Sequence, residues 1–262
     1  MKTTTTKFLT VTLLAAVSAA ITASSADFLD LFKSKPAVGA SAGSPASLAG
    51  LSQDQMVGGL KEALGKGVQQ AVANLGKTDG FLKDTKVKIP MPASLQKVET
   101  TLRTLRQDKL ADEFVTTMNR AAEQAVPEAA AVLGDSVKQM SIADAKTILT
   151  GTNNAATQYF RRTSETNLHA RFLPIVKTAT EKAGVTGAYK RMTERASGGL
   201  GGLAGLGSSA LGKQMPDLDN YVTTKTLDGL FLKIAEQEKL IRANPVARTT
   251  DLLQKVFGAV AQ

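Results

Sequence analysis

The chain has 262 residues, a formal net charge of +9 at pH 7, no cysteine and one histidine. Its length fits one domain with a single buried core. The absence of cysteine excludes a disulfide framework, a thiol nucleophile and a thiolate metal site, and a single histidine excludes a His-rich metal site. We therefore predict that the protein holds no metal and needs no cofactor.

The first 26 residues have the pattern of a signal peptide. Two lysines precede the apolar run 8–20, which is too short to span a bilayer as a helix. Small residues follow, with one cleavage site after Ala26 and an alternative after Ala20. No later stretch approaches the roughly 20 apolar residues that a transmembrane helix needs. The sequence thus predicts a periplasmic or secreted protein without a transmembrane segment.

A linker and a helical domain are expected after the signal peptide. Residues 27–51 are rich in Ala, Ser, Gly and Pro, which is typical of a flexible linker. In residues 52–258 apolar side chains recur at helical spacing, and no strand-turn-helix alternation occurs. This pattern predicts an all-α, single, multi-helix bundle-like domain. Its Gly-rich stretch 197–212 is interpreted as a mobile connector, with a lid over an apolar pocket as the alternative.

Capping and breaking residues give the expected helix boundaries. Ser141 and Asp144 resemble a capping box, and Pro174 should kink or divide the helical stretch that contains it. A break is expected at Asn244-Pro245, before a second, shorter helix. The expected helices cover residues 53–75, 94–105, 109–125, 127–140, 142–150, 154–160, 163–183, 186–196 and 217–243.

An acid lies inside the apolar stripe of the longest expected helix. Glu238 shares a helix face with Ile234 and Ile241. A buried carboxylate needs an arginine or a hydrogen-bond partner, because it is otherwise neutralised. We predict that Glu238 pairs inside the bundle with Arg161 or Arg242, as a structural pin rather than a ligand site. The alternative is a solvent-exposed ion pair with Arg242, four residues on.

Two further polar groupings complete the candidate residues. Asn119 and Glu123 lie one turn apart beside an alanine-rich face, and Tyr159 and Arg161 crowd a helix end. The alternatives are a solvated helix edge for the first pair, and core packing of the ring with an exposed arginine for the second. No Gly-x-Ser-x-Gly elbow and no marked carboxylate pair occurs, so no catalytic residue is assigned. The predicted ligand site or buried polar cluster comprises Asn119, Glu123, Tyr159, Arg161, Glu238 and Arg242.

Several longer motifs carry a family resemblance. They are GLKEALGKGVQQAV (59–72), IPMPASLQKVETTLR (89–103), MNRAAEQAVPEA (118–129), MSIADAKTILTG (140–151), NAATQYFRR (154–162), DLDNYVTTKTLDGLF (217–231) and IRANPVARTTDLLQKVFG (241–258). In this order the motifs resemble a bacterial family of exported proteins, domain of unknown function 4197. The resemblance implies an exported, mostly helical domain and supplies no activity and no catalytic residue. Residues 197–215 belong to none of these motifs, which implies a loop outside the shared core.

The function expected from the sequence is binding rather than catalysis. Basic residues exceed acidic ones in the segment 161–195, and basic surfaces attract phosphate-rich partners. For an exported protein, an apolar or anionic cell-envelope component such as a lipid is a more natural partner than nucleic acid. The alternative is a structural protein that docks an envelope protein partner, and a carboxylate-based hydrolase is the third interpretation.

Overall fold

A computed structural model of the chain describes residues 52–182 and 217–244, together with residues 187, 191, 254 and 256. Within these residues every regular element is helical, so the predicted all-α class is confirmed. The elements are α2 (Gln53–Gly76), η2 (Ala93–Leu95), α3 (Gln96–Thr104), α4 (Asp108–Ala125), η3 (Val126–Glu128), α5 (Ala129–Gln139), α6 (Ile142–Thr150), α7 (Ala155–Lys182) and α10 (Leu218–Ala243). The expected signal peptide, linker and Gly-rich connector lie outside the described residues, and only two residues are described in each of the helices expected at 186–196 and after Pro245.

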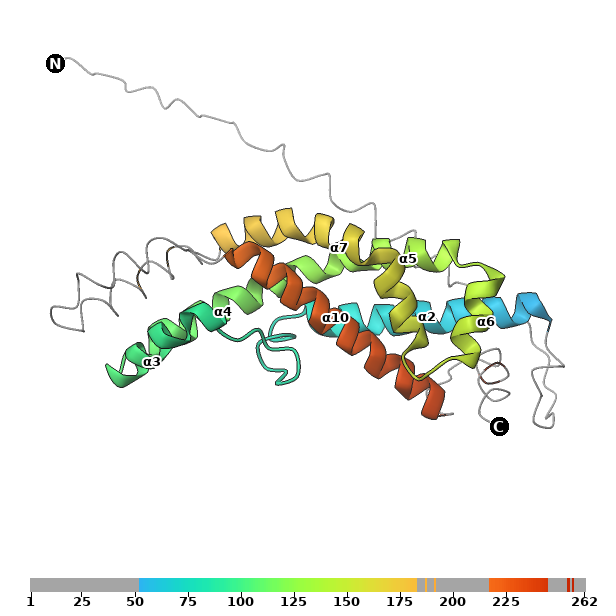
Figure 1. Cartoon of the computed structure of the whole chain (residues 1–262), viewed down its shortest axis with the longest axis horizontal. Helices are drawn as coiled ribbons and strands as arrows, with labels where there is room; N and C mark the ends of the chain where they lie inside the picture. The colour runs from blue at the N-terminus through green and yellow to red at the C-terminus, as the bar shows by residue number, and fades with distance from the viewer. Residues whose placement is uncertain are drawn as a thin grey trace, which may run out of the picture.

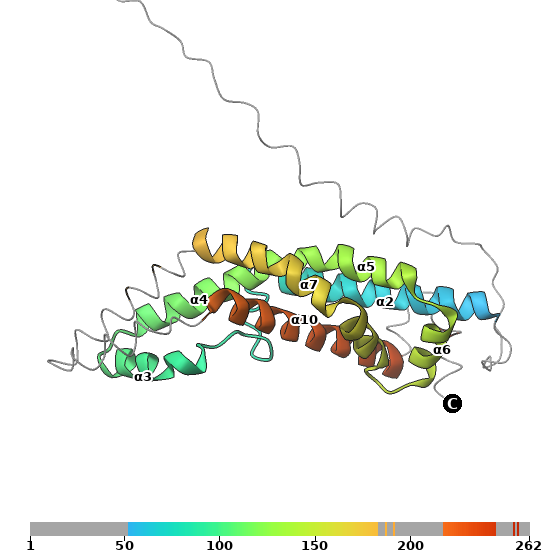
Figure 2. The same ribbon diagram turned by 45° about the horizontal axis from the view of Figure 1, so that its top comes forward.

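The described helices form an elongated bundle that α10 crosses. α10 packs against α7, α2 and α4, and α7 also packs against α4, α5 and α6. Figures 1 and 2 both place α3 and the start of α4 at one end, and α6 with the start of α2 at the other. α10 is therefore the element that ties the length of the bundle together. No helix in the described part of the chain is both long and apolar enough to cross a membrane.

The core is aromatic and aliphatic. Five phenylalanines are fully buried, and they come from α4, α7, α10 and the segment between α2 and η2: Phe81, Phe114, Phe160, Phe172 and Phe231. Each fully buried side chain of this size stabilises the fold by about 1.5–3 kcal/mol relative to leaving it in water. Because these rings belong to elements distant in sequence, one contiguous core holds the bundle together.

Two capping boxes fix the helix starts at the end of the bundle where α2 and α6 meet. The Ser141 hydroxyl accepts from the Asp144 N–H at 3.1 Å, and the Asp144 carboxylate accepts from the Ser141 N–H at 3.2 Å. The same reciprocal pair forms at the start of α2 between Ser52 and Gln55. Each box satisfies two backbone donors that have no partner within the helix. The predicted box at Ser141 is therefore confirmed.

The helix α7 is longer than the sequence indicates. We expected one segment to end at Phe160 and another to start at Thr163 or Ser164, and this division is wrong. The hydroxyls of both residues are used inside a continuous helix rather than as caps. Thr163 Oγ1 donates to the Tyr159 carbonyl at 2.9 Å, and Ser164 Oγ lies 2.5 Å from Ser136 Oγ on α5.

Pro174 does not divide α7 either. The helix continues past it to Lys182. A proline removes one backbone donor, which weakens the helix at that point. The turn beyond it is bridged by Thr178, whose hydroxyl donates to the Pro174 carbonyl at 2.9 Å. Packing of α7 against α10 and α4 offsets the lost bond.

Candidate functional site

The Glu238 carboxylate caps a different helix from its own. It lies on α10 and is 6% exposed. Oε1 accepts from the Ala156 N–H at 3.0 Å, and Oε2 accepts from the Thr157 N–H at 3.0 Å and the Thr157 hydroxyl at 2.9 Å. The first N–H groups of a helix have no partner within it, and a negative charge is favourable there. Glu238 thus fixes the start of α7 against α10.

Arg242 is the cationic partner of Glu238. Its Nε and Nη2 donate to Glu238 Oε1 at 3.1 and 2.9 Å, and Nη2 also donates to the Ile148 carbonyl at 2.8 Å. The two side chains are 10% and 5% exposed, so this pair is not the solvated ion pair of the alternative interpretation. Ile148 belongs to the last turn of α6. The pair therefore joins α10 to the start of α7 and to the end of α6.

Arg161 lies elsewhere. It forms ion pairs with Glu165 at 2.8 Å and Asp228 at 3.5 Å, and its guanidinium lies over the Phe231 ring at 4.5 Å from the ring centre. Its side chain is only partly buried, and a cation placed over an aromatic face is attracted to the ring. Of the two partners that the sequence offers for Glu238, the structure places Arg242 beside it.

Asn119 holds the segment between α2 and η2, residues 77–92, on α4. It is fully buried, and its Oδ1 accepts from the Ile89 N–H at 2.8 Å. Its Nδ2 donates to the carbonyls of Ile89 at 2.9 Å and Val115 at 2.7 Å. The amide thus pairs with both backbone groups of Ile89, as a neighbouring strand does. This geometry serves the fold of the segment.

Glu123 performs the same task one turn later on α4. Its Oε1 accepts from the N–H groups of Phe81 at 3.1 Å and Leu82 at 3.3 Å. Its Oε2 accepts from Arg120, which also pairs with Asp79 at 2.5 Å. The carboxylate is buried, and the N–H groups satisfy it as buried charges require. The first polar grouping of the sequence is therefore a pair of backbone clamps rather than a solvated edge.

Tyr159 is buried on α7 and reaches α5. Its hydroxyl donates to the Ser136 carbonyl at 2.8 Å, and its ring meets Phe160 edge to face at 5.7 Å. Burial raises the pKa of the Tyr159 phenol above its ordinary value of 10.0. The neutral hydroxyl is therefore the form that serves as a donor to α5. Apart from the Glu238–Arg242 pair, the six candidate residues therefore occupy separate settings rather than one cluster.

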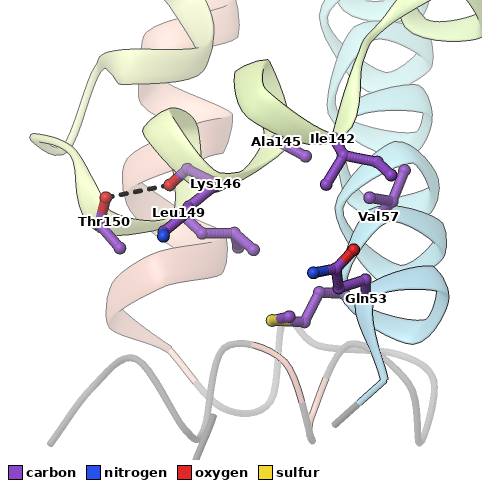
Figure 3. Close-up of a pocket in the computed structure, with 8 residues that line it drawn as sticks. Gln53, Val57, Ile142, Ala145, Lys146, Leu149 and Thr150 are labelled. Carbon is purple, nitrogen blue, oxygen red and sulfur yellow. Dashed lines mark hydrogen bonds between the residues drawn. The ribbon is translucent and has the colours of Figure 1, made fainter. Parts of the chain in front are cut away.

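An apolar groove lies where α2 and α6 face each other, and none of the six candidate residues predicted from the sequence lines it. We call it the α2/α6 groove. Its volume is about 320 Å³, and Figure 3 shows its side chains projecting from the two helices into the space between them. The residues that line it are Gln53, Met56 and Val57 of α2, and Ile142, Ala145, Lys146, Leu149 and Thr150 of α6.

A weak sequence signal for this groove exists. Ile142, Ala145 and Leu149 are spaced i, i+3 and i+7, which places them on one helical face. Ala145 and Leu149 are buried, whereas Ile142 is 53% exposed at the rim. The neighbouring Ile148 points to the core instead and is buried. An amphipathic pattern thus identifies the apolar stripe, but it does not show that part of this stripe is open to solvent.

A second, more polar pocket lies between α10, the start of α7 and the segment 77–92. Its volume is about 460 Å³. We call it the basic pocket, because four cationic side chains and one carboxylate line it: Lys86, Lys88, Arg161, Lys225 and Asp228. Among the described residues, no carboxylate lines the α2/α6 groove and Asp228 alone lines the basic pocket, so these residues offer no carboxylate pair suited to hydrolysis in either pocket.

A sequence model of the family described as "Protein of unknown function (DUF4197)" matches residues 50–258. The match covers every described helix, the α2/α6 groove and the basic pocket. Neither the search of curated proteins nor the search of solved structures gave a match. Because the family model matches most of the sequence, the chain belongs to the DUF4197 family.

Proposed function

We propose that this protein is an exported, non-enzymatic binding protein that holds the apolar chain of a cell-envelope amphiphile in the α2/α6 groove. One observation carries the proposal. The groove is an open, mostly apolar space of about 320 Å³, and Lys146 is the one cation among the described residues that line it. Small-molecule pockets are typically roughly 300–1,000 Å³ and mostly apolar, with a few polar groups that set orientation. Export is inferred from the N-terminal sequence.

The chemistry of the groove favours a chain with an anionic head. Each methylene group removed from water contributes about 0.8 kcal/mol, so affinity comes from the apolar wall. Lys146 makes no ion pair within the described part of the chain. An exposed cation of this kind adds about 0–1 kcal/mol to binding of a carboxylate or phosphate. Its role is therefore to orient the head group at the surface rather than to supply affinity.

The test is binding of a fluorescent fatty acid to the purified protein, with dodecanoic acid as competitor. Ile142→Glu places a charge at the apolar rim, and we expect at least a tenfold loss of affinity. Leu240→Glu is the matched control, because Leu240 is 46% exposed on α10 and lies outside the groove. Lys146→Gln should weaken binding of dodecanoic acid and leave binding of dodecanol unchanged. Equal behaviour of the two glutamate variants would contradict the proposal.

A protein partner is the second candidate, and the exposure of Ile142 favours it. An apolar rim residue that is more than half exposed is also what an amphipathic helix of an envelope protein covers. The two candidates differ in one result. If no acyl probe saturates the wild-type protein, and Ile142→Glu abolishes capture of one defined envelope protein that Leu240→Glu retains, the docking function replaces the lipid-binding one.

A further inference from the structure

The basic pocket gathers positive charge from three separate elements. Lys86 and Lys88 come from the segment 77–92, Arg161 from α7 and Lys225 from α10. The clamps at Asn119 and Glu123 described above hold the first of these elements in place, so the pocket is built by the fold. The cations are spread around a space of about 460 Å³ that is large enough for a small ligand.

Acidic neighbours neutralise only part of this charge. Lys86 pairs with Glu236 at 2.7 Å and Arg161 with Glu165 at 2.8 Å. Lys88 is exposed and makes no ion pair among the residues that the structure describes. The fourth cation, Lys225, has a distant partner in Asp228. Among the described residues, the pocket therefore keeps an excess of positive charge after its ion pairs are counted.

Asp228 is the carboxylate that occupies the pocket wall, and its ion pairs are long. It lies 3.5 Å from Arg161 Nη2 and 3.8 Å from Lys225 Nζ, and its side chain is 48% exposed. Charge-assisted hydrogen bonds have lengths of about 2.7–2.9 Å. Asp228 thus sits between two cations without making a short bond to either one. An external anion can approach both cations more closely than Asp228 does.

We propose that the basic pocket binds a phosphate group with two or more negative charges. Phosphate oxygens would contact Arg161 and Lys225, and Lys88 would add a third charge. The Phe231 ring supports the Arg161 guanidinium from one face, which leaves its edge for the anion. The start of α7 adds no donors, because Glu238 already accepts from the N–H groups of Ala156 and Thr157. Recognition depends on the side-chain cations.

Such a site must be sensitive to salt. Its cations are partly exposed, and exposed charges are screened over about 8 Å at physiological ionic strength. We therefore expect tight binding only at low ionic strength, with affinity falling steadily as sodium chloride is added. This inference does not depend on the α2/α6 groove, since none of the described residues lines both pockets.

The experiment titrates pyrophosphate into the full chain by calorimetry at low ionic strength. We expect Lys225→Ala and Lys88→Ala each to weaken binding at least fivefold, and Asp228→Asn to strengthen it at least threefold. Lys109→Ala is the control, because Lys109 is an exposed lysine on α4 outside the pocket. An affinity that Lys109→Ala changes as much as Lys225→Ala does, or that Asp228→Asn leaves unchanged, would overturn the proposal.

A second arm identifies the source of the phosphate. Vesicles of phosphatidylcholine with and without phosphatidic acid, whose phosphomonoester can carry two negative charges, are sedimented with wild-type protein and with Lys225→Ala. Binding that requires phosphatidic acid and is lost in Lys225→Ala assigns a lipid head group to the pocket. Pyrophosphate binding without any vesicle binding assigns a soluble phosphate compound. Absence of both overturns the proposal.

Discussion

Glu238 and Thr157 are 81 positions apart in the chain, and the Glu238 carboxylate accepts from both the N–H and the hydroxyl of Thr157 at 3.0 and 2.9 Å. Through Arg242 the same carboxylate reaches the Ile148 carbonyl of α6. One buried ion pair therefore sets where α7 begins and where α6 lies. Since α6 forms one wall of the α2/α6 groove, this pair also positions the proposed lipid site.

Glu238→Gln should destabilise the protein by about 2–3 kcal/mol. The amide replaces one accepting oxygen by a donor, so at least one buried N–H or hydroxyl of the Ala156-Thr157 turn loses its acceptor. Arg242 also loses its charged partner in a mostly buried position. Urea unfolding followed by circular dichroism measures the change.

Glu165→Gln is the control for this prediction. Glu165 pairs with Arg161 at a partly exposed position, where an ion pair contributes about 0–1 kcal/mol. We expect a change below about 0.5 kcal/mol for this variant. A Glu238→Gln protein as stable as Glu165→Gln would show that the buried carboxylate does not hold the helices together.

The sequence predicts the helices well because their signals are local. The capping box at Ser141, the break at Asn244 and the burial of Glu238 all follow from spacing within one or two turns. The division of α7 was predicted wrongly for the opposite reason. Thr163 and Ser164 favour helix starts in isolation, but the Thr163 hydroxyl donates to the Tyr159 carbonyl of its own helix and the Ser164 hydroxyl pairs with Ser136 on α5.

The candidate sites depend on contacts between distant residues, which periodicity does not report. Glu238 and Arg242 are four residues apart, and this spacing predicts that they can pair. The bond from Thr157 to Glu238 could not be predicted, because nothing in the sequence marks a partner 81 residues away. The pockets are still harder to predict from the sequence. The wall of the α2/α6 groove follows an ordinary amphipathic stripe, and only the structure shows that Ile142 at its rim is exposed.

Asn119→Ala should release the segment 77–92 from α4. The substitution leaves the N–H and the carbonyl of Ile89 without their partners in the core, and we expect a loss of about 2 kcal/mol or more. Amide hydrogen exchange should show Ile89 losing protection more than residues of α2 do. Gln124→Ala, at an exposed position of the same helix, is the control. Unchanged protection at Ile89 would contradict the clamp.

Two glycines at helix contacts should respond to alanine with opposite signs. At Gly229 of α10 a Cβ would lie 2.7 Å from the Phe81 ring and 3.2 Å from Val87 Cβ, both buried. Overpacking of this kind costs about 1–3 kcal/mol. At Gly67 of α2 a Cβ would lie 3.6 Å from Gln237 Cβ, which is ordinary contact. Gly67→Ala should therefore stabilise the protein by about 0.5–1 kcal/mol through helix propensity.

Thermal unfolding of the two glycine variants, measured side by side, checks this pair. A rise in melting temperature for Gly67→Ala and a fall for Gly229→Ala are expected. Destabilisation by both would mean that α2 and α10 approach each other more closely at Gly67 than described. Stabilisation by both would mean that the segment 77–92 does not pack on α10 at Gly229.

The capping box of α6 should make the protein sensitive to acid. The Ser141 hydroxyl is the main cause that lowers the pKa of the Asp144 carboxyl below its ordinary value of 3.8, with further contributions from the Ser141 N–H and Arg162. A carboxylate with a depressed folded-state pKa stabilises the fold fully above its ordinary pKa. The contribution is lost as the pH falls through the lower, folded-state value. Stability from this box should therefore decline below about pH 4.

The difference in unfolding free energy between wild type and Asp144→Asn measures this contribution. We expect about 0.5–1 kcal/mol at pH 6–7, and a smaller difference as the pH falls below about 4. Asp135→Asn, an exposed acid on α5 that pairs with Lys138, controls for the loss of a surface charge. Because α6 lines the α2/α6 groove, fatty-acid binding should weaken over the same pH range in the wild type. A difference that stays constant from pH 7 to pH 3 would show that the ionised carboxylate does not cap α6.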